Sequence, residues 1–244
     1  MKLATCNPVT SLSELRFFTT PEHDCSYLTG RQAVTLFADP LAHIDTELYS
    51  SLSEVGFRRS GAHIYRPYCQ DCSACIPVRL PVTSFTVRRR HKRVWKLNQD
   101  IQIQALPPSL TDEYFALYKK YIDTRHADGD MYPAEMGQFE SFLVNGRPEA
   151  IFFEFRENEK LLAIAVADQI RDGLSAIYTF FDTDLEDRSL GVFAILWLIE
   201  EAKRLGLPHV YLGYWIKECQ KMSYKMDYKP IELFINNHWV PVNK

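Results

Sequence analysis

The chain lacks any segment long and apolar enough to cross a membrane. Its longest apolar run, Leu190 to Ile199, contains a glycine, and a membrane helix needs about 20 apolar residues. The first residues, Met1 to Phe18, lack the apolar core of a secretory signal. We therefore expect a cytoplasmic protein that does not act on membranes.

Internal repeats and low-complexity stretches are also absent, which leaves an ordinary globular protein. The chain has 244 residues, of which 46% are hydrophobic and 24% are charged. These values are typical of a folded chain with a sizeable core. The length fits one or two domains.

Cysteines are few, and half of them lie in one cluster. Cys69, Cys72 and Cys75 are spaced as C-x-x-C-x-x-C, and the sequence has no separate second C-x-x-C motif. Zinc and iron–sulfur sites usually have four protein ligands, and Cys25 and His63 are the candidates for the fourth. Bunched cysteines in a cytosolic protein indicate metal or redox chemistry more often than disulfides. We expect either a zinc or iron–sulfur site on Cys25 and the cluster, or free cysteines that pack in the fold.

The net charge of −3 hides a basic segment. Six basic residues lie within nine positions of a chain that has 28 basic and 31 acidic residues. They are Arg88, Arg89, Arg90, Lys92, Arg93 and Lys96. On a helix, Arg89, Arg93 and Lys96 would share one face. Such a dense cluster predicts contact with the phosphates of a nucleic acid, and a solubilising surface is the alternative.

The order of expected elements divides the chain into two parts. In the first part we expect a helix at residues 31–37 capped by Thr29, a helix to residue 55 capped by Asp45, an extended stretch at 57–67 and a strand between Pro77 and Pro81. In the second part we expect helices at 111–123 and 135–144, strands at 150–156, 161–170 and 174–181, a helix at 189–205, a strand at 209–215, a short helix at 218–226 and a hairpin at 231–240.

The second series has the order of the GNAT acyltransferase fold, although a shared order of elements does not establish chemistry. We expect an α+β protein with a GNAT-like acyltransferase fold at residues 106–244. Residues 1–105 are expected to form a smaller N-terminal domain that contains the cysteines and the basic segment.

The junction before the helix at 189–205 resembles the phosphate-binding signature of that fold, Q/R-x-x-G-x-G/A. Arg188 and Gly191 match, and backbone amides at a helix start can hold a pyrophosphate. Phe193 stands where the signature has glycine or alanine, and we expect its bulk to hinder the pyrophosphate of CoA. The site is therefore predicted to hold something other than CoA, with a plain core helix as the alternative.

Two further features point to anionic ligands. Lys221, Tyr224, Lys225 and Tyr228 would share one face of a helix, and such a stripe can hold phosphates and stack on bases, unless it is a solvated lysine face. In the extended stretch 57–67, the neighbours Arg58 and Arg59 point to opposite faces, so one of them is expected to enter any given pocket. A guanidinium is the natural bidentate partner of a carboxylate, and a surface pair is the alternative.

Together, these segments resemble the arginyl-tRNA–protein transferase family, most closely its short bacterial branch, the aspartate/glutamate leucyltransferases. The resemblance runs in order through nearly the whole chain. It is carried by residues 25–28 (CSYL), 56–75 (from GFRRSG through the cysteine cluster), 125–131 (RHADGDM) and 211–225 (from YLGYWI to KMSYK), with 177–191 also fitting.

The resemblance implies a reaction. The free α-amine of a protein that begins with Asp or Glu attacks the aminoacyl ester of a tRNA, a peptide bond forms, and the tRNA leaves. The bacterial branch implies leucyl-tRNA as the donor, with arginyl-tRNA as the family alternative, and the product is marked for the N-end rule degradation machinery. No cofactor is required, because the ester is activated and an α-amine with a pKa of about 8 is partly neutral at pH 7.

Candidate site residues fall into three groups. Arg58, Arg59 and Tyr65 are expected to bind the acceptor, with Arg59 reading its carboxylate. The expected tRNA contacts are Arg89, Arg93, Lys96, Arg188, Gly191, Lys221 and Lys225. Asp182, Tyr214 and Tyr224 are candidate catalytic residues by location, and no residue stands out as a general base.

Two other functional classes remain open at this point. An acyl-CoA N-acyltransferase is opposed by Phe193 and the basic segment. A metal-stabilised RNA-binding module without enzymatic activity would leave the GNAT-like half of the chain without a role.

Overall fold

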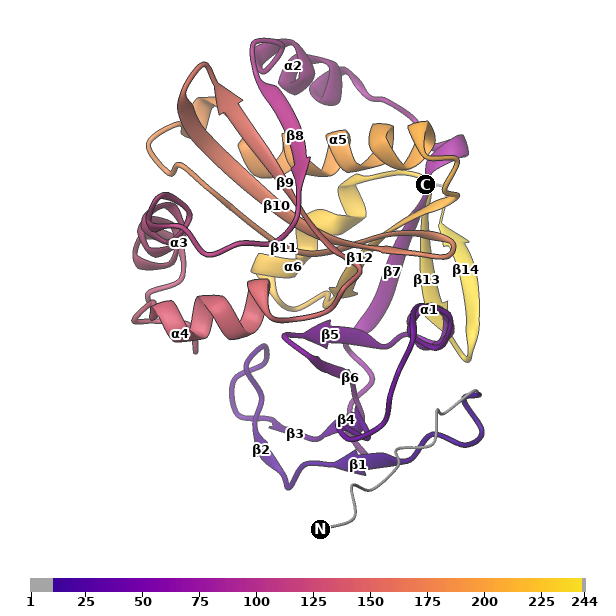
Figure 1. The fold of residues 1–244 in the computed structure, drawn as a ribbon. Helices are drawn as coiled ribbons and strands as arrows, with labels where there is room; N and C mark the ends of the chain where they lie inside the picture. Colours follow the sequence, from indigo (N-terminus) through magenta and orange to yellow (C-terminus); the bar gives the residue numbers. More distant parts are fainter. Residues whose placement is uncertain (1–10, 243–244) are drawn as a thin grey trace.

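The computed structural model describes residues 11–242, and a large twisted sheet of eight strands dominates it (Figure 1). The strands have the order β14-β13-β7-β12-β11-β10-β9-β8. They are β7 (Ile76–Pro81), β8 (Gln102–Leu106), β9 (Ala150–Glu157), β10 (Lys160–Ile170), β11 (Gly173–Phe181), β12 (His209–Trp215), β13 (Ile231–Ile235) and β14 (His238–Val242). Neighbouring strands are antiparallel, except that β11 and β12 run parallel. The chain is therefore a mixed α/β protein built on one large sheet.

Helices cover both faces of this sheet, which explains why β10 is buried along nearly its whole length. On one face, α5 (Leu190–Arg204) packs a core with Ala163 and Ala165 of β10, and α2 (Arg89–Leu97) lies beside α5 at the top of Figure 1. On the other face, α3 (Asp112–Arg125), α4 (Met136–Phe139) and the π-helical turn η2 (Glu140–Val144) contribute to a second core around Ile164 and Phe180. Successive residues of β10 thus serve different cores, as a strand requires.

A smaller N-terminal layer packs below the large sheet in Figure 1. Its main sheet has the order β1-β4-β6-β5, and a two-stranded ladder joins β2 to β3. The elements are β1 (Phe17–Thr19), β2 (His23–Asp24), β3 (Gln32–Ala33), β4 (Thr35–Ala38), α1 (Thr46–Glu54), β5 (Arg58–Ser60) and β6 (His63–Pro67). The Asp45 side chain caps α1 by accepting a hydrogen bond of 2.8 Å from the Leu48 amide. Ile170 and Tyr211 of the large sheet belong to the core of this layer, which therefore packs directly on the large sheet.

Most elements expected in the second half of the chain are confirmed in order. β11 and β12 lie side by side, with Gly173 opposite His209. The expected helix at 218–226 is shorter: α6 (Gln220–Ser223) is followed by a 3-10 turn, η4 (Tyr224–Asp227). None of the helices within residues 11–242 is long and apolar enough to cross a membrane.

Two expectations for the first half need correction. The helix expected at 31–37 is wrong, because β4 pairs with β1 and β6 there, and strand pairing overrides the local capping signal at Thr29. The boundary expected between residues 105 and 106 does not separate the sheets. β7 lies between β12 and β13, and β8 forms one edge of the same large sheet.

Candidate active site

The two parallel strands separate soon after they meet. β11 and β12 pair only at Gly173–His209, Leu174–Val210 and Ser175–Tyr211, although β11 continues to Phe181 and β12 to Trp215. Beyond Ser175 the facing backbone groups are free for other partners. The carboxyl ends of neighbouring strands are a common place for ligands in α/β proteins, and we call this opening the β11–β12 splay.

Arg58 of β5 reaches into the splay. Its Nη2 donates to the Ala176 carbonyl at 2.6 Å, and the residue as a whole is 7% exposed. Its Nη1 is buried and has no hydrogen-bond partner, and no carboxylate in residues 11–242 forms an ion pair with this guanidinium. Tyr65 stands directly opposite on β6. A buried guanidinium nitrogen without a partner is an unfilled site for an anion.

Arg59 is in the opposite situation. Its Nε and Nη2 donate to both oxygens of Asp168 at 2.6 and 2.7 Å, and its Nη1 donates to the carbonyls of Gly61 and Phe142. Both ion-paired side chains are fully buried, and Tyr49 donates to the same carboxylate at 2.7 Å. The structure therefore corrects our expectation that Arg59 reads the acceptor: its donors are used to hold β5, β10 and η2 together.

Lys225 lies next to Arg58 rather than on the surface. Gly213, at a β-bulge of β12 with a φ of 76°, brings the backbone close to both cations. A Cβ at Gly213 would stand 3.8 Å from Arg58 Nε and 3.9 Å from Lys225 Nζ. Burial, followed by the Arg58 charge, lowers the pKa of Lys225 to about 7. The four residues expected to share one helical face do not share one environment, because Lys225 is buried and Tyr228 is buried against His91, while Lys221 and Tyr224 are exposed.

The three candidate catalytic residues have other partners. Asp182 lies just past the end of β11, six residues and about 20 Å of extended strand from Ala176. It pairs with Lys120 at 2.5 Å and Lys160 at 2.8 Å, and its pKa is lowered to about 2 because these ion pairs outweigh its burial. The Tyr214 hydroxyl donates to the Gly56 carbonyl at 3.0 Å. The Tyr224 ring lies 5.8 Å from Lys225 Nζ. No base is evident among these three.

The basic segment forms helix α2. Arg89, Arg93 and Lys96 are exposed, and none of them forms an ion pair with a carboxylate in the described part of the chain. Arg90 pairs with Asp227 of η4 at 2.9 Å, so the start of α2 lies next to the turn that carries Lys225. Contact between these cations and tRNA stays a prediction.

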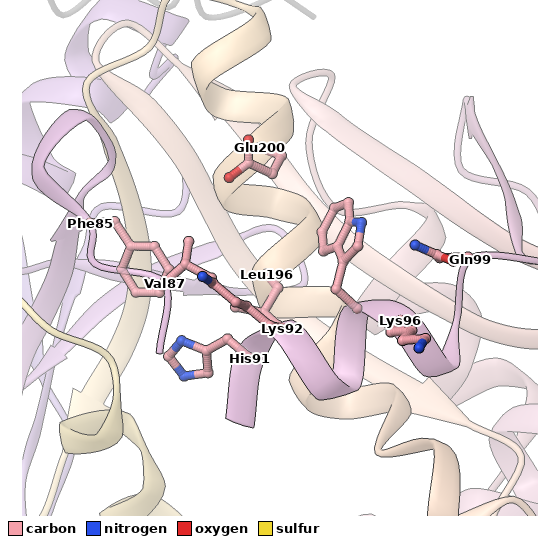
Figure 2. A pocket seen from close by; sticks show the side chains of 9 residues that line it. Phe85, Val87, His91, Lys92, Lys96, Gln99, Leu196 and Glu200 are labelled. Carbon is pink, nitrogen blue, oxygen red and sulfur yellow. The ribbon is translucent and has the colours of Figure 1, made fainter. Parts of the chain in front are cut away.

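A pocket of about 460 Å³ lies between α2 and α5, and Figure 2 shows the side chains that line it. Phe85, Trp95 and Leu196 give it apolar walls, while Lys92 and Lys96 stand on α2 and Glu200 on α5. An apolar recess beside lysines can accept a planar base next to a phosphate. Our sequence analysis missed it because it depends on two helices that are distant in the chain.

The residues expected to contact tRNA at the start of α5 are paired or packed within the protein. Arg188 pairs with Glu157 at 3.0 Å and with Asp100, and it binds Asn98. It therefore joins the turn before α5 to the end of α2 instead of facing solvent. Gly191 allows close packing, because a Cβ there would stand 3.1 Å from the Phe181 ring. Phe193 is buried against Trp95. Our argument that its bulk blocks a pyrophosphate is therefore wrong, since the ring points into the core.

Five cysteines of the described part of the chain lie close to one another. The thiols of Cys25, Cys69, Cys72 and Cys219 surround Cys75, whose pKa is raised to about 12, mainly by burial. Within residues 11–242, however, no three histidine, cysteine or acidic side chains are arranged to hold a metal ion. The residues do not fit a zinc ion or an iron–sulfur cluster in this arrangement, and no step of the chemistry below uses one.

One segment joins the two layers at the edge of the site. We call residues 125–131 the bridging segment. Asp128 pairs with Lys221 of α6 at 2.7 Å, and Asp130 accepts a hydrogen bond of 3.2 Å from Ser26. Lys221 is exposed and paired with a carboxylate, and its contact with tRNA stays a prediction.

Two structural partners escaped the sequence analysis. Asp168 is the only charged residue between Lys160 and Arg171. A lone charge inside an apolar strand is a signal of a buried partner of opposite charge, but it does not say which arginine that partner is. Gly213 gave no comparable signal, because its role depends on how β5 and η4 meet at β12.

Known proteins match this chain along nearly its whole length. The model for the C terminus of arginine-tRNA-protein transferase matches residues 113–235, and the model for its N terminus matches residues 23–93. The aspartate/glutamate leucyltransferase of Pseudomonas paraeruginosa (strain DSM 24068 / PA7) is 57% identical over 232 residues, which covers 95% of this chain and 99% of that protein. The protein of the same name from Pseudomonas fluorescens (strain Pf0-1) is 54% identical over 235 residues, covering 96% and 100%.

Among solved structures, L-PGS from Bacillus licheniformis is more distant, with a TM-score of 0.45 and 10% identity over 83% of this chain and 69% of that chain. The two family models together match most of the sequence. The chain belongs to the arginine-tRNA-protein transferase family.

Proposed function

We propose that this protein transfers leucine from leucyl-tRNA to the N-terminal Asp or Glu of acceptor proteins. Relatives that are 54% and 57% identical over nearly their whole length carry the name aspartate/glutamate leucyltransferase. The observation that carries the proposal is Arg58, a buried guanidinium with one unpartnered nitrogen at the opening between two strands. An acidic side chain supplies the missing partner.

The acceptor binds with its side-chain carboxylate on Arg58 Nη1. Asp and Glu provide this group, whereas the matching amides provide no charge, and a charged hydrogen bond contributes about 1.5–3 kcal/mol. The fixed cation also suits the chemistry, because a positive charge beside the α-amine disfavours its protonation. Tyr65, opposite Arg58 on β6, lines the same place.

The tRNA approaches from α2. Lys225 and Asp227 are two residues apart, which limits their Cα atoms to about 7 Å, and Asp227 pairs with Arg90 of α2. A tRNA backbone on α2 therefore lies near the splay. The first amides of α5, which lie beside Phe181 at the far end of β11, provide a positive helix end for a phosphate of the same tRNA.

In this proposal the fold acts as a GNAT-like acyltransferase whose acyl donor is an aminoacyl ester. The splayed parallel strands and the helix after β11 support that likeness. The new N-terminal leucine would mark the acceptor for N-end rule degradation, which places the reaction in the cytoplasm. No metal or other cofactor is needed, because positioning and electrostatic stabilisation can accelerate attack on an activated ester.

The test is a transfer assay with a mixture of charged tRNAs and peptides that differ only at the first residue. Mass spectrometry identifies the added residue. We expect leucine on Asp and Glu peptides, with the Asn and Gln peptides reacting roughly 10- to 100-fold more slowly, as expected for loss of a charged hydrogen bond. Addition of arginine would reassign the donor. Equal transfer to the acid and amide peptides would contradict the role of Arg58.

A further inference from the structure

Lys225 is a buried amine without an anionic partner. It is 4% exposed, and no carboxylate in residues 11–242 pairs with it. Its Nζ donates to the Tyr214 carbonyl and contacts Met222 Sδ at 3.1 Å. A protonated ammonium is costly in such surroundings. A neutral amine can direct its two N–H groups to these atoms and keep its lone pair for another partner.

That lone pair lies near the expected position of the acceptor amine. Arg58 and Lys225 both approach the same point beside Gly213, within 4.0 Å. In an N-terminal Asp or Glu, three or four bonds separate the α-nitrogen from the carboxylate carbon, a distance of roughly 3–5 Å at ordinary bond lengths. A carboxylate on Arg58 therefore brings the α-amine within reach of Lys225.

We infer that Lys225 is the proton acceptor of the transfer step, an inference that rests on the proposed function. The α-amine nitrogen bonds to the ester carbonyl carbon, and its surplus proton passes to Lys225 Nζ. The bond between that carbon and the ribose oxygen breaks, and Lys225 returns the proton to this leaving oxygen. The products are an amide and a free ribose hydroxyl, and Lys225 ends in its starting state.

The charged and titratable groups around Lys225 are compatible with this role. Arg58, from β5, lowers its pKa, and Cys219 and Cys75 would raise it if they ionised. The Tyr224 ring faces the amine from η4. A base that titrates near the working pH can both take and release a proton, and such a base contributes roughly 10²- to 10⁴-fold to a rate.

The test measures single-turnover transfer of leucine from purified leucyl-tRNA to an Asp peptide, across the pH range around neutrality. We expect Lys225→Ala and Lys225→Arg each to lower the transfer rate roughly 10²- to 10⁴-fold. In both variants the change in rate with pH near 7 should also disappear. Small primary amines in solution should restore leucine transfer by Lys225→Ala, and the restored rate should increase with the basicity of the amine. Transferred peptide and free leucyl-amine differ in mass, so side reaction of the added amine is recognised.

Lys229→Met is the matched control, because Lys229 is also buried but lies beside Arg88 instead of Arg58. It should keep the wild-type profile. The unfolding midpoint shows whether Lys225→Ala folds. If it does not, Lys225→Met replaces it, because methionine keeps the volume of the side chain. Lys225→Met has no base and should show the same loss of transfer rate.

The outcomes distinguish failure of the Lys225 assignment from failure of the proposed function. If the wild-type protein transfers leucine but Lys225→Arg keeps more than about a tenth of its rate, or if folded Lys225 variants keep the change in rate with pH near 7, the assignment of Lys225 is wrong and the proposed function stands. If the wild-type protein adds no amino acid to any acceptor, the proposed function itself fails.

Discussion

Arg58 and Arg59 are consecutive residues of one short strand, yet their surroundings differ in every respect that matters for a guanidinium. Arg59 faces Asp168 with a complete set of partners, whereas Arg58 faces the splay with one nitrogen unpaired. The first arrangement is that of a structural ion pair. The second leaves one guanidinium nitrogen without a partner, and we propose that the acceptor carboxylate binds there. The two faces of β5 thus differ in whether the guanidinium has a complete set of partners.

The largest effect on stability should come from removing the Arg59–Asp168 ion pair. Arg59→Ala leaves the Asp168 carboxylate buried beside Tyr49 without its cation. Removal of one partner from a buried ion pair costs about 3–5 kcal/mol. We expect a loss of this size in the free energy of unfolding, measured by urea denaturation. Arg59→Lys should recover only part, since lysine lacks the bidentate fork.

Arg58→Ala should have the opposite profile. We expect the rate of transfer to Asp and Glu peptides to fall by a factor equivalent to about 2 kcal/mol or more, because a charged hydrogen-bond partner is lost. The urea midpoint should stay the same or rise, since a buried charge without a partner is removed. Binding of leucyl-tRNA should remain close to normal. A shift of the midpoint as large as that of Arg59→Ala would erase the distinction between the two faces.

A third measurement separates the splay from the basic helix. Replacing Arg89, Arg93 and Lys96 of α2 by glutamine should weaken tRNA binding and reduce its dependence on salt. The log–log slope should fall by up to about 0.7–0.9 for each lost phosphate contact. Peptide preference should not change, because these side chains are exposed on α2 whereas Arg58 is buried on β5. An unchanged slope would show that α2 is a solubilising surface.

The smallest effect is expected at Asp182. Its ion pairs lower its pKa to about 2 from the usual 3.8. A carboxyl group whose pKa is lower in the folded state contributes stability above its unfolded pKa and loses it as pH falls. The difference in unfolding free energy between wild type and Asp182→Asn should therefore be present at neutral pH and disappear between about pH 4 and pH 2.

At neutral pH this difference should be about 1 kcal/mol or less, because Lys120 and Lys160 are partly exposed. Leucine transfer by Asp182→Asn at neutral pH should remain near the wild-type rate. A loss comparable to that of Lys225→Ala would return Asp182 to the catalytic group.

Local patterns predicted most of the elements, because capping and periodicity act within a few residues. Asp45 and Thr111 mark the starts of α1 and α3, and the run to Ile170 gives β10. The helix predicted at 31–37 was wrong, because β4 forms its backbone hydrogen bonds with β1 and β6, and β6 is distant in sequence.

The site was predictable in composition but not in assignment. The pair at 58 and 59 was identified as the place for a carboxylate, but the choice between the two required Asp168, which lies more than a hundred residues away. Lys225 was identified as a cation, but a helical stripe could not show that η4 turns it inward beside Arg58. Side-chain partners across the large sheet decide these roles, and periodicity does not encode them.

The bridging segment is fastened to both layers by groups that water reaches. The Lys221–Asp128 pair is exposed on both sides, and the Ser26–Asp130 hydrogen bond is exposed as well. An exposed ion pair of this kind is weak, because water solvates both charges and salt screens them. Higher ionic strength would therefore weaken the Lys221–Asp128 pair, whereas the Arg59–Asp168 pair, which is fully buried, would be screened much less. The bridging segment would thus be held less firmly at high salt, while the junction between β5 and β10 would change little.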